Sequence, residues 1–268
     1  MADLQVPDLV NSYLLFCNYR DSCLKTKILD LSWCKWIYPT TLLPLGIFIK
    51  ENKKKFEYKA PFDHNVSNYI ALVTGELKIE HPEEKSYIPV VALPKDQRQS
   101  IKILESIFKL HRNGEEYGGE NAFKYLVEEL VDNIYQHSDF NNALVMAQKY
   151  EKKKFVEISF FDDGISIPGN FEKKGMKFED QEAIAEAVNG LSTKSQERGH
   201  GLNSNLKIFT QCLNGEILIV SRSGALFVSK KLQKLYKLQE IYKLKGTLIS
   251  VRIPYPVPKI DIFKSGYL

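Results

Sequence analysis

The sequence predicts an α/β protein of two parts, a small α/β unit over residues 1–95 and a larger domain over residues 119–256. Helix-like and strand-like apolar patterns alternate through the first part. The second part opens with an amphipathic helix, followed by strands and glycine turns. A length of 268 residues allows two modest domains that each bury a core.

Composition excludes several classes of protein. Apolar residues make up 44% and charged residues 26%, as in ordinary globular proteins, and no apolar run approaches the roughly 20 residues of a membrane span. The N-terminal residues include Asp3 and Asp8 and lack the layout of a secretory signal. The four cysteines show no CxxC spacing. We therefore expect a cytoplasmic protein with reduced thiols and no membrane segment.

The net charge of +4 comes largely from lysine clusters at residues 53–55, 152–154 and 230–245. Such clusters are typical of solvated surface, and a nucleic-acid surface would interleave arginines and aromatic residues, so nucleic acid is not the expected partner. Residues 229–245 also carry apolar residues at helical spacing. They predict a basic amphipathic helix, which either binds a protein partner or packs peripherally with its lysines in water.

The first part reads as short alternating elements, and a helix links it to the second part. The expected elements are helix 9–17, strand 27–31, helix 41–50, strand 56–59 and helix 63–73. Apolar residues at three- and four-residue steps predict a connecting helix between residues 95 and 111. Residues 114–120, rich in glycine and glutamate, predict a flexible, solvated turn. We expect residues 96–118 to connect the two parts and residues 257–268 to form a tail.

A helix from about residue 121 carries two candidate catalytic residues. Its apolar stripe runs from Phe123 to Ile134, and Glu129 and Asn133 stand one turn apart at the border of that stripe. From there they can look into a cleft. The amide oxygen can bind a hard cation such as Mg²⁺, and the carboxylate can deprotonate a water. Taken alone, the pair is better interpreted as an ordinary feature of a helix flank.

A strand over residues 155–161 ends in Asp162-Asp163-Gly164. Alternation along the strand delivers Asp162 directly to its end, where binding groups tend to lie. A carboxylate there can accept a hydrogen bond from an exocyclic amine. Without context, Asp-Asp-Gly is a common turn signal.

A glycine-rich segment precedes the next helix. Lys194 and Arg198 lead into Gly199-His200-Gly201, and helical spacing begins at Leu202. Backbone amides freed at a helix start, approached closely beside glycines, make a phosphate-binding nest to which the two cations add charge. The alternative is a flexible glycine loop before an amphipathic helix.

Four segments in this order resemble the conserved boxes of the GHKL family, which includes histidine kinases, gyrase and MutL. They are residues 129–133, 162–164, 199–202 and 246–251, and they span about half of the chain. The resemblance implies an ATP-binding domain over residues 119–256, with an α/β sandwich, a mixed sheet, helices on one face and a mobile lid over ATP.

The resemblance also implies a role for each matching residue. Asn133 would be the Mg²⁺ ligand and Glu129 the general base. Asp162 would take the adenine amine, Gly164 would permit close approach of the base, and Thr247 would support the adenine contact.

The lid would take Thr193, Lys194, Gly199, Gly201 and Leu202, with the two glycines shaping it against the phosphates. One departure is Ser166, which stands where the family has a second glycine. That substitution would narrow the base pocket or alter the motion of the lid. His137 would face the same cleft, either touching phosphate or satisfying a core hydrogen bond, and His200 has no assigned role.

The first part more loosely resembles STAS-like regulatory domains, through a strand at residues 27–32 and a helix start at residues 37–41. In anti-sigma-factor antagonists of that family a GHKL kinase phosphorylates a serine at the helix start. Thr40 or Thr41 stands at the comparable place, although capping of the helix is the preferred interpretation.

Two classes of function remain. One is a slow regulatory ATPase or protein serine/threonine kinase that uses ATP and Mg²⁺. The other is a non-catalytic switch or interaction module, in which ATP orders the lid and so changes a partner surface. A self-contained histidine kinase is not expected, because only a single helix, carrying His111, precedes the domain. A protein partner is expected in both classes, and the resemblance to the family implies a possible homodimer.

Overall fold

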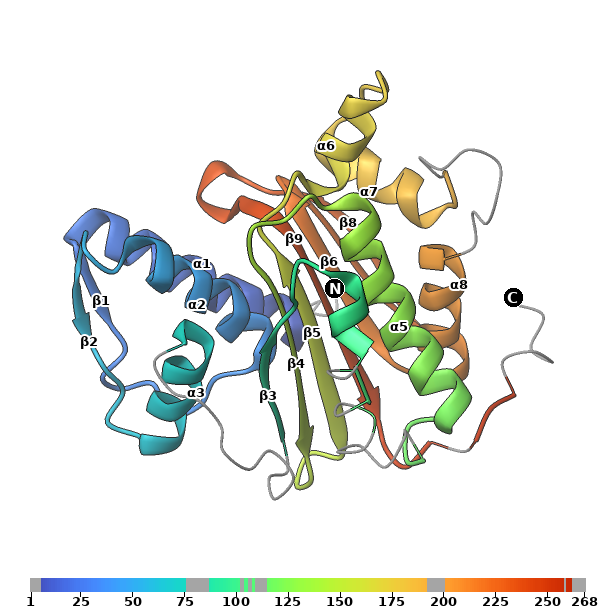
Figure 1. Ribbon diagram of the computed structural model, residues 1–268, viewed down its shortest axis with the longest axis horizontal. Coiled ribbons are helices and arrows are strands. Elements are labelled where there is room, and N and C mark those ends of the chain that lie inside the picture. Colours follow the sequence, from blue (N-terminus) through green and yellow to red (C-terminus); the bar gives the residue numbers. More distant parts are fainter. Residues whose placement is uncertain are drawn as a thin grey trace, which may run out of the picture.

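A seven-stranded antiparallel sheet forms the centre of the computed structural model (Figure 1). The structure describes residues 6–75, 87–101, 104, 105, 108, 115–191, 201–257 and 259–261. The strand order is β3-β4-β5-β9-β6-β7-β8. Their bounds are β3 Tyr87–Ala92, β4 Ala143–Tyr150, β5 Phe155–Asp162, β6 Glu216–Arg222, β7 Gly224–Ser229, β8 Gln233–Lys237 and β9 Leu244–Pro254.

Helices cover both faces of this sheet (Figure 1). On one side lie α5 (Glu120–His137), α6 (Ser166–Lys173), α7 (Asp180–Val188) and α8 (Gly201–Lys207), which continues as a π-helical turn (Ile208–Cys212). On the other side lie α1 (Asp8–Thr26), α2 (Pro39–Asn52) and α3 (His64–Thr74), beside a small parallel sheet of β1 (Ile28–Asp30) and β2 (Glu57–Lys59). We call these sides the α5 face and the α2 face.

The expectation of a mixed sheet is wrong, whereas the helices of residues 119–256 lie on one face of the sheet, as expected, and the helices of the first part cover the other face. Neighbouring strands of the central sheet run antiparallel throughout the described residues. Its strands also bury side chains on both faces: Phe160 packs in the core below α5, whereas Phe161 packs in the core shared with α1 and α2. Because successive side chains of a strand point to opposite faces, each strand needs a cover on both sides.

The first part of the chain shares its core with the central sheet. Leu42 and Leu43 of α2 belong to the same buried cluster as Leu218 and Leu248 of the sheet. In addition, β3 lies on the N-terminal side of the boundary expected near residue 95, yet it pairs with β4. The division into two domains stays a prediction about folding units, and the structure joins both parts through one core.

The start of α2 is held by a buried polar cluster from the sheet. Glu157 of β5, 0% exposed, accepts hydrogen bonds from the backbone N–H and the hydroxyl of Thr40, at 3.0 and 2.7 Å. Arg252 of β9 donates to the same carboxylate at 2.8 Å and to Asp8 of α1 at 3.1 Å. A carboxylate at a helix N-terminus is favoured by the helix dipole, and here it comes from another element of the fold.

We expected Thr40 or Thr41 to cap α2 with its side chain, but neither threonine does so. Thr40 donates its hydroxyl to Glu157, and Thr41 donates its hydroxyl to the backbone oxygen of Ser12. Both threonines are 0% exposed. Neither hydroxyl is accessible to a kinase in this arrangement.

The segment at residues 229–245 is a strand and a turn, not the expected amphipathic helix. β8 pairs antiparallel with β7, and a 3-10 turn (Glu240–Tyr242) leads into β9. Arg20 of α1 donates to the backbone oxygens of Ile241 and Lys243, at 2.7 and 2.6 Å. Pairing with the edge of the sheet outweighed the helical spacing of the apolar residues.

The link between the parts is more tightly packed than expected. The turn at residues 115–119 contains Tyr117, which is 1% exposed, and Gly118, which has a φ of +95°. A Cβ on Gly118 would lie 2.2 Å from Leu213, so this turn lies close against the core and is not a solvated loop.

Among the helices that the structure describes, none combines the length and the apolar character that a membrane span requires.

Candidate functional site

Polar side chains meet at the end of three neighbouring strands on the α5 face. Asp162 ends β5 and pairs with Thr247 of β9, which pairs in turn with Ser221 of β6. By strand alternation all three share the face of Phe160 and Ile249, in the core below α5. All three are buried, with exposed fractions of 4%, 8% and 0%. They form a small polar cluster at the edge of an apolar layer.

Asp162 is the most unusual member of this cluster. Within the described residues, the hydrogen bond to its carboxylate comes from the backbone N–H of Gly164, at 3.0 Å. Burial raises its pKa to about 7, and the neighbouring charge of Asp163 adds to the shift. A buried carboxylate with so little compensation is the kind of group that a ligand completes.

Asp163, the next residue, has the opposite environment. Its carboxylate accepts from the backbone N–H groups of Asn141 and Asn142, at 2.7 and 2.8 Å, and from the Asn142 side chain at 2.8 Å. Burial raises the pKa of Asp163, but these hydrogen bonds together outweigh it, and the pKa lies below its ordinary value. Asp163 is therefore a structural anchor of the strand end.

Two glycines of the matching segments are required by close packing. A Cβ on Gly164 would lie 2.0 Å from the backbone oxygen of Ser138, at the end of α5. A Cβ on Gly246, whose φ is +85°, would lie 1.9 Å from the backbone oxygen of Asp162. Both glycines bring neighbouring chain segments against the Asp162 turn. Whether Gly164 also admits a base stays a prediction.

Ser221 and Thr247 form a hydroxyl pair beside Asp162. Their side-chain oxygens lie 3.0 Å apart. The Ser221 oxygen also lies 3.1 Å from the backbone oxygen of Gly246 and accepts from the N–H of Ile167 at 3.0 Å. Ser221 thus orients Thr247 and ties β6 and β9 to α6. The sequence analysis missed Ser221; the signal was a serine at the end of a continuous apolar run.

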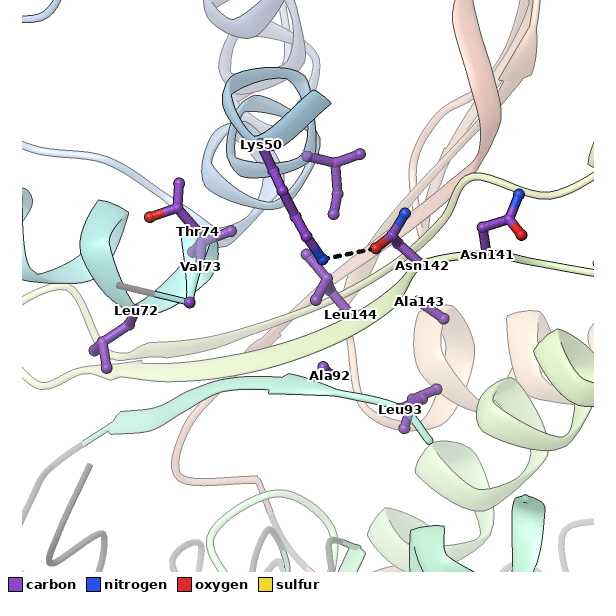
Figure 2. Close-up of a pocket in the computed structure, with 12 residues that line it drawn as sticks. Lys50, Leu72, Val73, Thr74, Ala92, Leu93, Asn141, Asn142, Ala143 and Leu144 are labelled. Atoms are coloured by element: carbon purple, nitrogen blue, oxygen red, sulfur yellow. Dashed lines mark hydrogen bonds between the residues drawn. The ribbon is translucent and has the colours of Figure 1, made fainter. Parts of the chain in front are cut away.

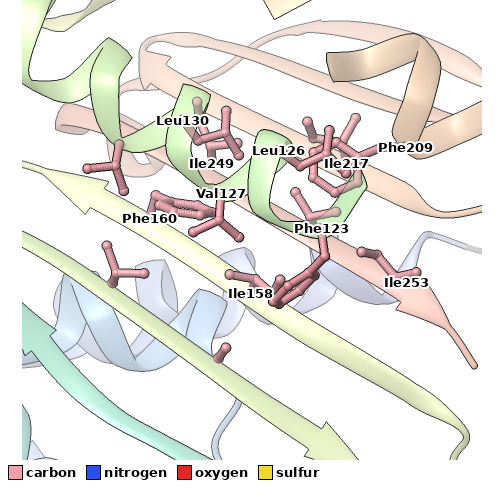
Figure 3. Packing of buried hydrophobic residues seen from close by; sticks show 14 of the residues in the cluster. Phe123, Leu126, Val127, Leu130, Ile158, Phe160, Phe209, Ile217, Ile249 and Ile253 are labelled. Atoms are coloured by element: carbon pink, nitrogen blue, oxygen red, sulfur yellow. The ribbon is translucent and has the colours of Figure 1, made fainter. Parts of the chain in front are cut away.

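The helix that carries Glu129 and Asn133 packs on the sheet as its stripe predicts. Figure 3 shows Phe123, Leu126 and Leu130 of α5 packed over the strands. Glu129 and Asn133 lie at the flank of this contact and are half-buried. The Nδ2 atom of Asn133 is buried with no hydrogen-bond partner among the described residues. Such a donor is costly unless a ligand satisfies it.

His137 lies one turn beyond Asn133. Its Nδ1 atom is 3.3 Å from Nδ2 of Asn170 on α6. This contact fits the structural role that was one of the two alternatives for this histidine.

Ser166 stands in the left-handed region, with a φ of +76°. Its hydroxyl accepts from the N–H of Gly169 at 3.2 Å, in the first turn of α6. Glycine adopts this backbone conformation without steric cost, whereas serine does not. The position therefore favours glycine for a local backbone reason.

Three residues of the expected lid, Thr193, Lys194 and Gly199, lie outside the described residues, as does His200. Gly201 begins α8, and the side chain of Leu202 is half-buried against the core below α5. In the described residues there is no group of three or more His, Cys, Asp and Glu side chains that could hold a metal. Glu129 and Asn133 therefore suit Mg²⁺ only if phosphate oxygens and water complete its coordination.

A cavity of about 160 Å³ lies elsewhere, between α2, α3 and the β3–β4 edge (Figure 2). None of the predicted site residues lines it. Its walls combine apolar side chains with the polar residues Lys50, Thr74, Asn141 and Asn142. The dashed line in Figure 2 is the hydrogen bond from Lys50 to Asn142, at 2.9 Å. The cavity thus borders the anchor of Asp163.

Comparison with known proteins leaves the family open. No model of a protein family matches the chain, and no curated protein does. Among solved structures, the chain is similar to the ATP-binding domain of topoisomerase IV from Francisella tularensis in complex with a small-molecule inhibitor, at 16% identity and a TM-score of 0.29. That similarity covers 68% of this chain and 47% of that chain, so the chain spans about half of its length. The likeness is distant.

Proposed function

We propose that the protein binds ATP with Mg²⁺ at the ends of β5, β9 and β6, as a slow regulatory ATPase or protein serine/threonine kinase of the GHKL type. The observation that carries this proposal is Asp162. Its carboxylate is 4% exposed, has a raised pKa, and forms no ion pair with a described residue. A ligand amine would supply the missing donor.

An adenine base suits this cluster chemically. Its exocyclic amine donates to an ionised carboxylate, and the adjacent ring nitrogen accepts from a hydroxyl. Asp162 supplies the acceptor, and the Thr247 hydroxyl would turn its hydrogen from the Ser221 oxygen to the ring nitrogen when the base binds. A guanine presents a carbonyl oxygen at the place of the amine, which would face the Asp162 carboxylate unfavourably. The proposal therefore includes a preference for adenine.

In this proposal, the flank of α5 binds the metal, and the segment that leads into α8 binds the phosphates. Asn133 would hold Mg²⁺ through its amide, and its buried, unpartnered Nδ2 atom supports a polar ligand there. Bound Mg²⁺ supplies charge neutralisation of the phosphates. Glu129, one turn earlier on α5, is the proposed general base that takes a proton from the attacking nucleophile. Lys194, Gly199, Gly201 and Leu202 are proposed to close on the phosphates.

The test is ATP binding and ATP hydrolysis by the purified full chain with Mg²⁺, for wild type and Glu129→Ala. Loss of hydrolysis with binding retained is the result expected of a base. Asn133→Ala should weaken the Mg²⁺-dependent part of binding. The absence of ATP binding by wild type would overturn the proposal.

A nucleotide-gated switch is the second candidate. The observation that favours it is the contact between α2 and the Asp163 anchor, since it ties the first part of the chain to the candidate site. Tight ATP binding without turnover, in the presence of Mg²⁺, is the result expected of a switch.

A further inference from the structure

The last turn of α2 contacts the segment before β4, whose first residue pairs with Asp162, and the start of β9, which carries Thr247. Lys50 donates to the side-chain oxygen of Asn142 at 2.9 Å, in the segment that leads into β4. The next residue, Glu51, lies 3.4 Å from Lys245, two positions before Thr247 in β9. Two adjacent residues of one helix turn thus contact the neighbours of Asp162 and of Thr247 from the α2 face.

The contact through Lys50 continues to the candidate site without a gap. The Asn142 side chain, whose oxygen accepts the hydrogen bond from Lys50, donates through its nitrogen to Asp163 at 2.8 Å. The backbone of Asp163 donates to the backbone oxygen of Asn142 at 3.0 Å, which closes the anchor. Asp163 directly follows Asp162, so the anchor fixes the backbone on which the Asp162 carboxylate is mounted. The relay runs from Lys50 through Asn142 to Asp163.

The hydrogen bond between Lys50 and Asn142 is the contact of this relay that can break. Lys50 is exposed, whereas Asp163 is 4% exposed and accepts hydrogen bonds from two backbone N–H groups and one side chain. The cavity of about 160 Å³ borders Lys50 and Asn142, so the lysine has room to leave the amide (Figure 2). The parallel contact from Glu51 to Lys245 is exposed on both sides and contributes little, because solvent screens it.

We propose that Lys50, Asn142 and Asp163 are positioning residues through which α2 sets the affinity of the Asp162 site for ATP. The inference rests on the proposed function. With the relay closed, Asp162 stands in the orientation that accepts the adenine amine. With Lys50 displaced from Asn142, the anchor loosens and affinity falls. A protein partner or ligand that moves α2 would thereby regulate the site.

The experiment is a double-mutant cycle on the equilibrium Kd for ATP, measured with the full chain. Lys50→Met should raise the Kd about fivefold, as expected for a residue that acts through a coupling network. Asn142→Ala should raise it at least as much, while the two backbone N–H groups still hold Asp163. In the Asn142→Ala background, Lys50→Met should then have no further effect, because the relay is already broken. Lys50→Arg should restore most of the affinity.

The matched control is Lys54→Met, an exposed lysine just beyond α2, which should leave the Kd unchanged. Unfolding midpoints of all variants separate a change in affinity from a loss of fold, and Lys50→Met should leave the midpoint close to that of wild type. An unchanged Kd for Lys50→Met, or an equal effect in both backgrounds, would overturn this inference and leave the proposed function standing. A wild type that binds no ATP would overturn both.

Discussion

Two carboxylates of β5, five residues apart, lie buried on opposite faces of the same sheet. On the α2 face, Glu157 accepts hydrogen bonds from Thr40 and Arg252. On the α5 face, Asp162 accepts one from the Gly164 backbone, within the described residues. Both are almost fully buried, at 0% and 4% exposure. A buried charge with complete partners holds the fold together, whereas one with incomplete partners is a candidate for binding.

The largest effect is expected when the partnered carboxylate loses its cation. Arg252→Met leaves Glu157 charged and buried, so the free energy of unfolding should fall by about 3–5 kcal/mol. Urea denaturation measures it. Lys237→Met, which removes an exposed ion pair with Glu179, is the control and should change little. An equally small effect of both variants would remove the distinction between a buried structural pair and a surface one.

The carboxylate with incomplete partners, Asp162, should show the reverse effect on stability. Because the folded-state pKa of Asp162 is raised above its unfolded value of about 3.8, the folded protein binds more protons in that range, and stability falls as pH rises from about 4 to about 7. Asp162→Asn removes this cost and should stabilise the protein at pH 8 by up to about 4 kcal/mol. The same variant should bind ATP about 10- to 100-fold more weakly, because a neutral amide replaces the charged acceptor. Urea denaturation at pH 8 and pH 4 checks the sign, since the gain should vanish at pH 4.

A smaller effect is expected on the pH dependence of binding. The adenine amine donates to the ionised form of Asp162, whose pKa lies at about 7. Lowering the pH from about 8 to about 6 should therefore raise the Kd for ATP about tenfold. Titration calorimetry at both values measures it. A flat profile would mean that this carboxylate does not receive the base.

The smallest effect concerns the strained serine beside Asp162. Ser166→Gly relieves a φ of +76° but gives up the 3.2 Å hydrogen bond to Gly169 and adds freedom to the unfolded chain. A net stabilisation of about 0.5 kcal/mol is expected in thermal unfolding. Ser166→Ala keeps the strain and loses the hydrogen bond, so it should destabilise. If Ser166→Gly also proved destabilising, the lost hydrogen bond to Gly169 would outweigh the relief of backbone strain.

The sequence predicted the α5 face better than the α2 face, for a physical reason. The stripe of α5 and the place of Asp162 at the end of a strand follow from local periodicity, and both are confirmed. The alternation of the same strand gives no reason to expect that its polar residues Glu157 and Ser159 are buried. In fact both are 0% exposed, because α2 and Arg252 supply their partners from distant parts of the chain.

The other features that the sequence analysis failed to predict were missed for the same reason. Ser221 and the anchor of Asp163 depend on pairings between segments far apart in sequence, which periodicity does not reveal. The segment 229–245 was expected to be helical because apolar spacing alone does not report a neighbouring strand edge. The predicted roles of Glu129, Asn133 and Thr247 depend on a bound ligand and stay predictions.

The central claim is that Asp162 recognises the amine of adenine. The most direct measurement compares equilibrium binding of ATP with that of purine riboside triphosphate, which lacks the 6-amino group, for wild type and Asp162→Asn. Wild type should bind ATP about 10- to 100-fold more tightly, as expected for a hydrogen bond to a charged group, and the variant should no longer discriminate. Equal affinity of wild type for the two nucleotides would contradict the account.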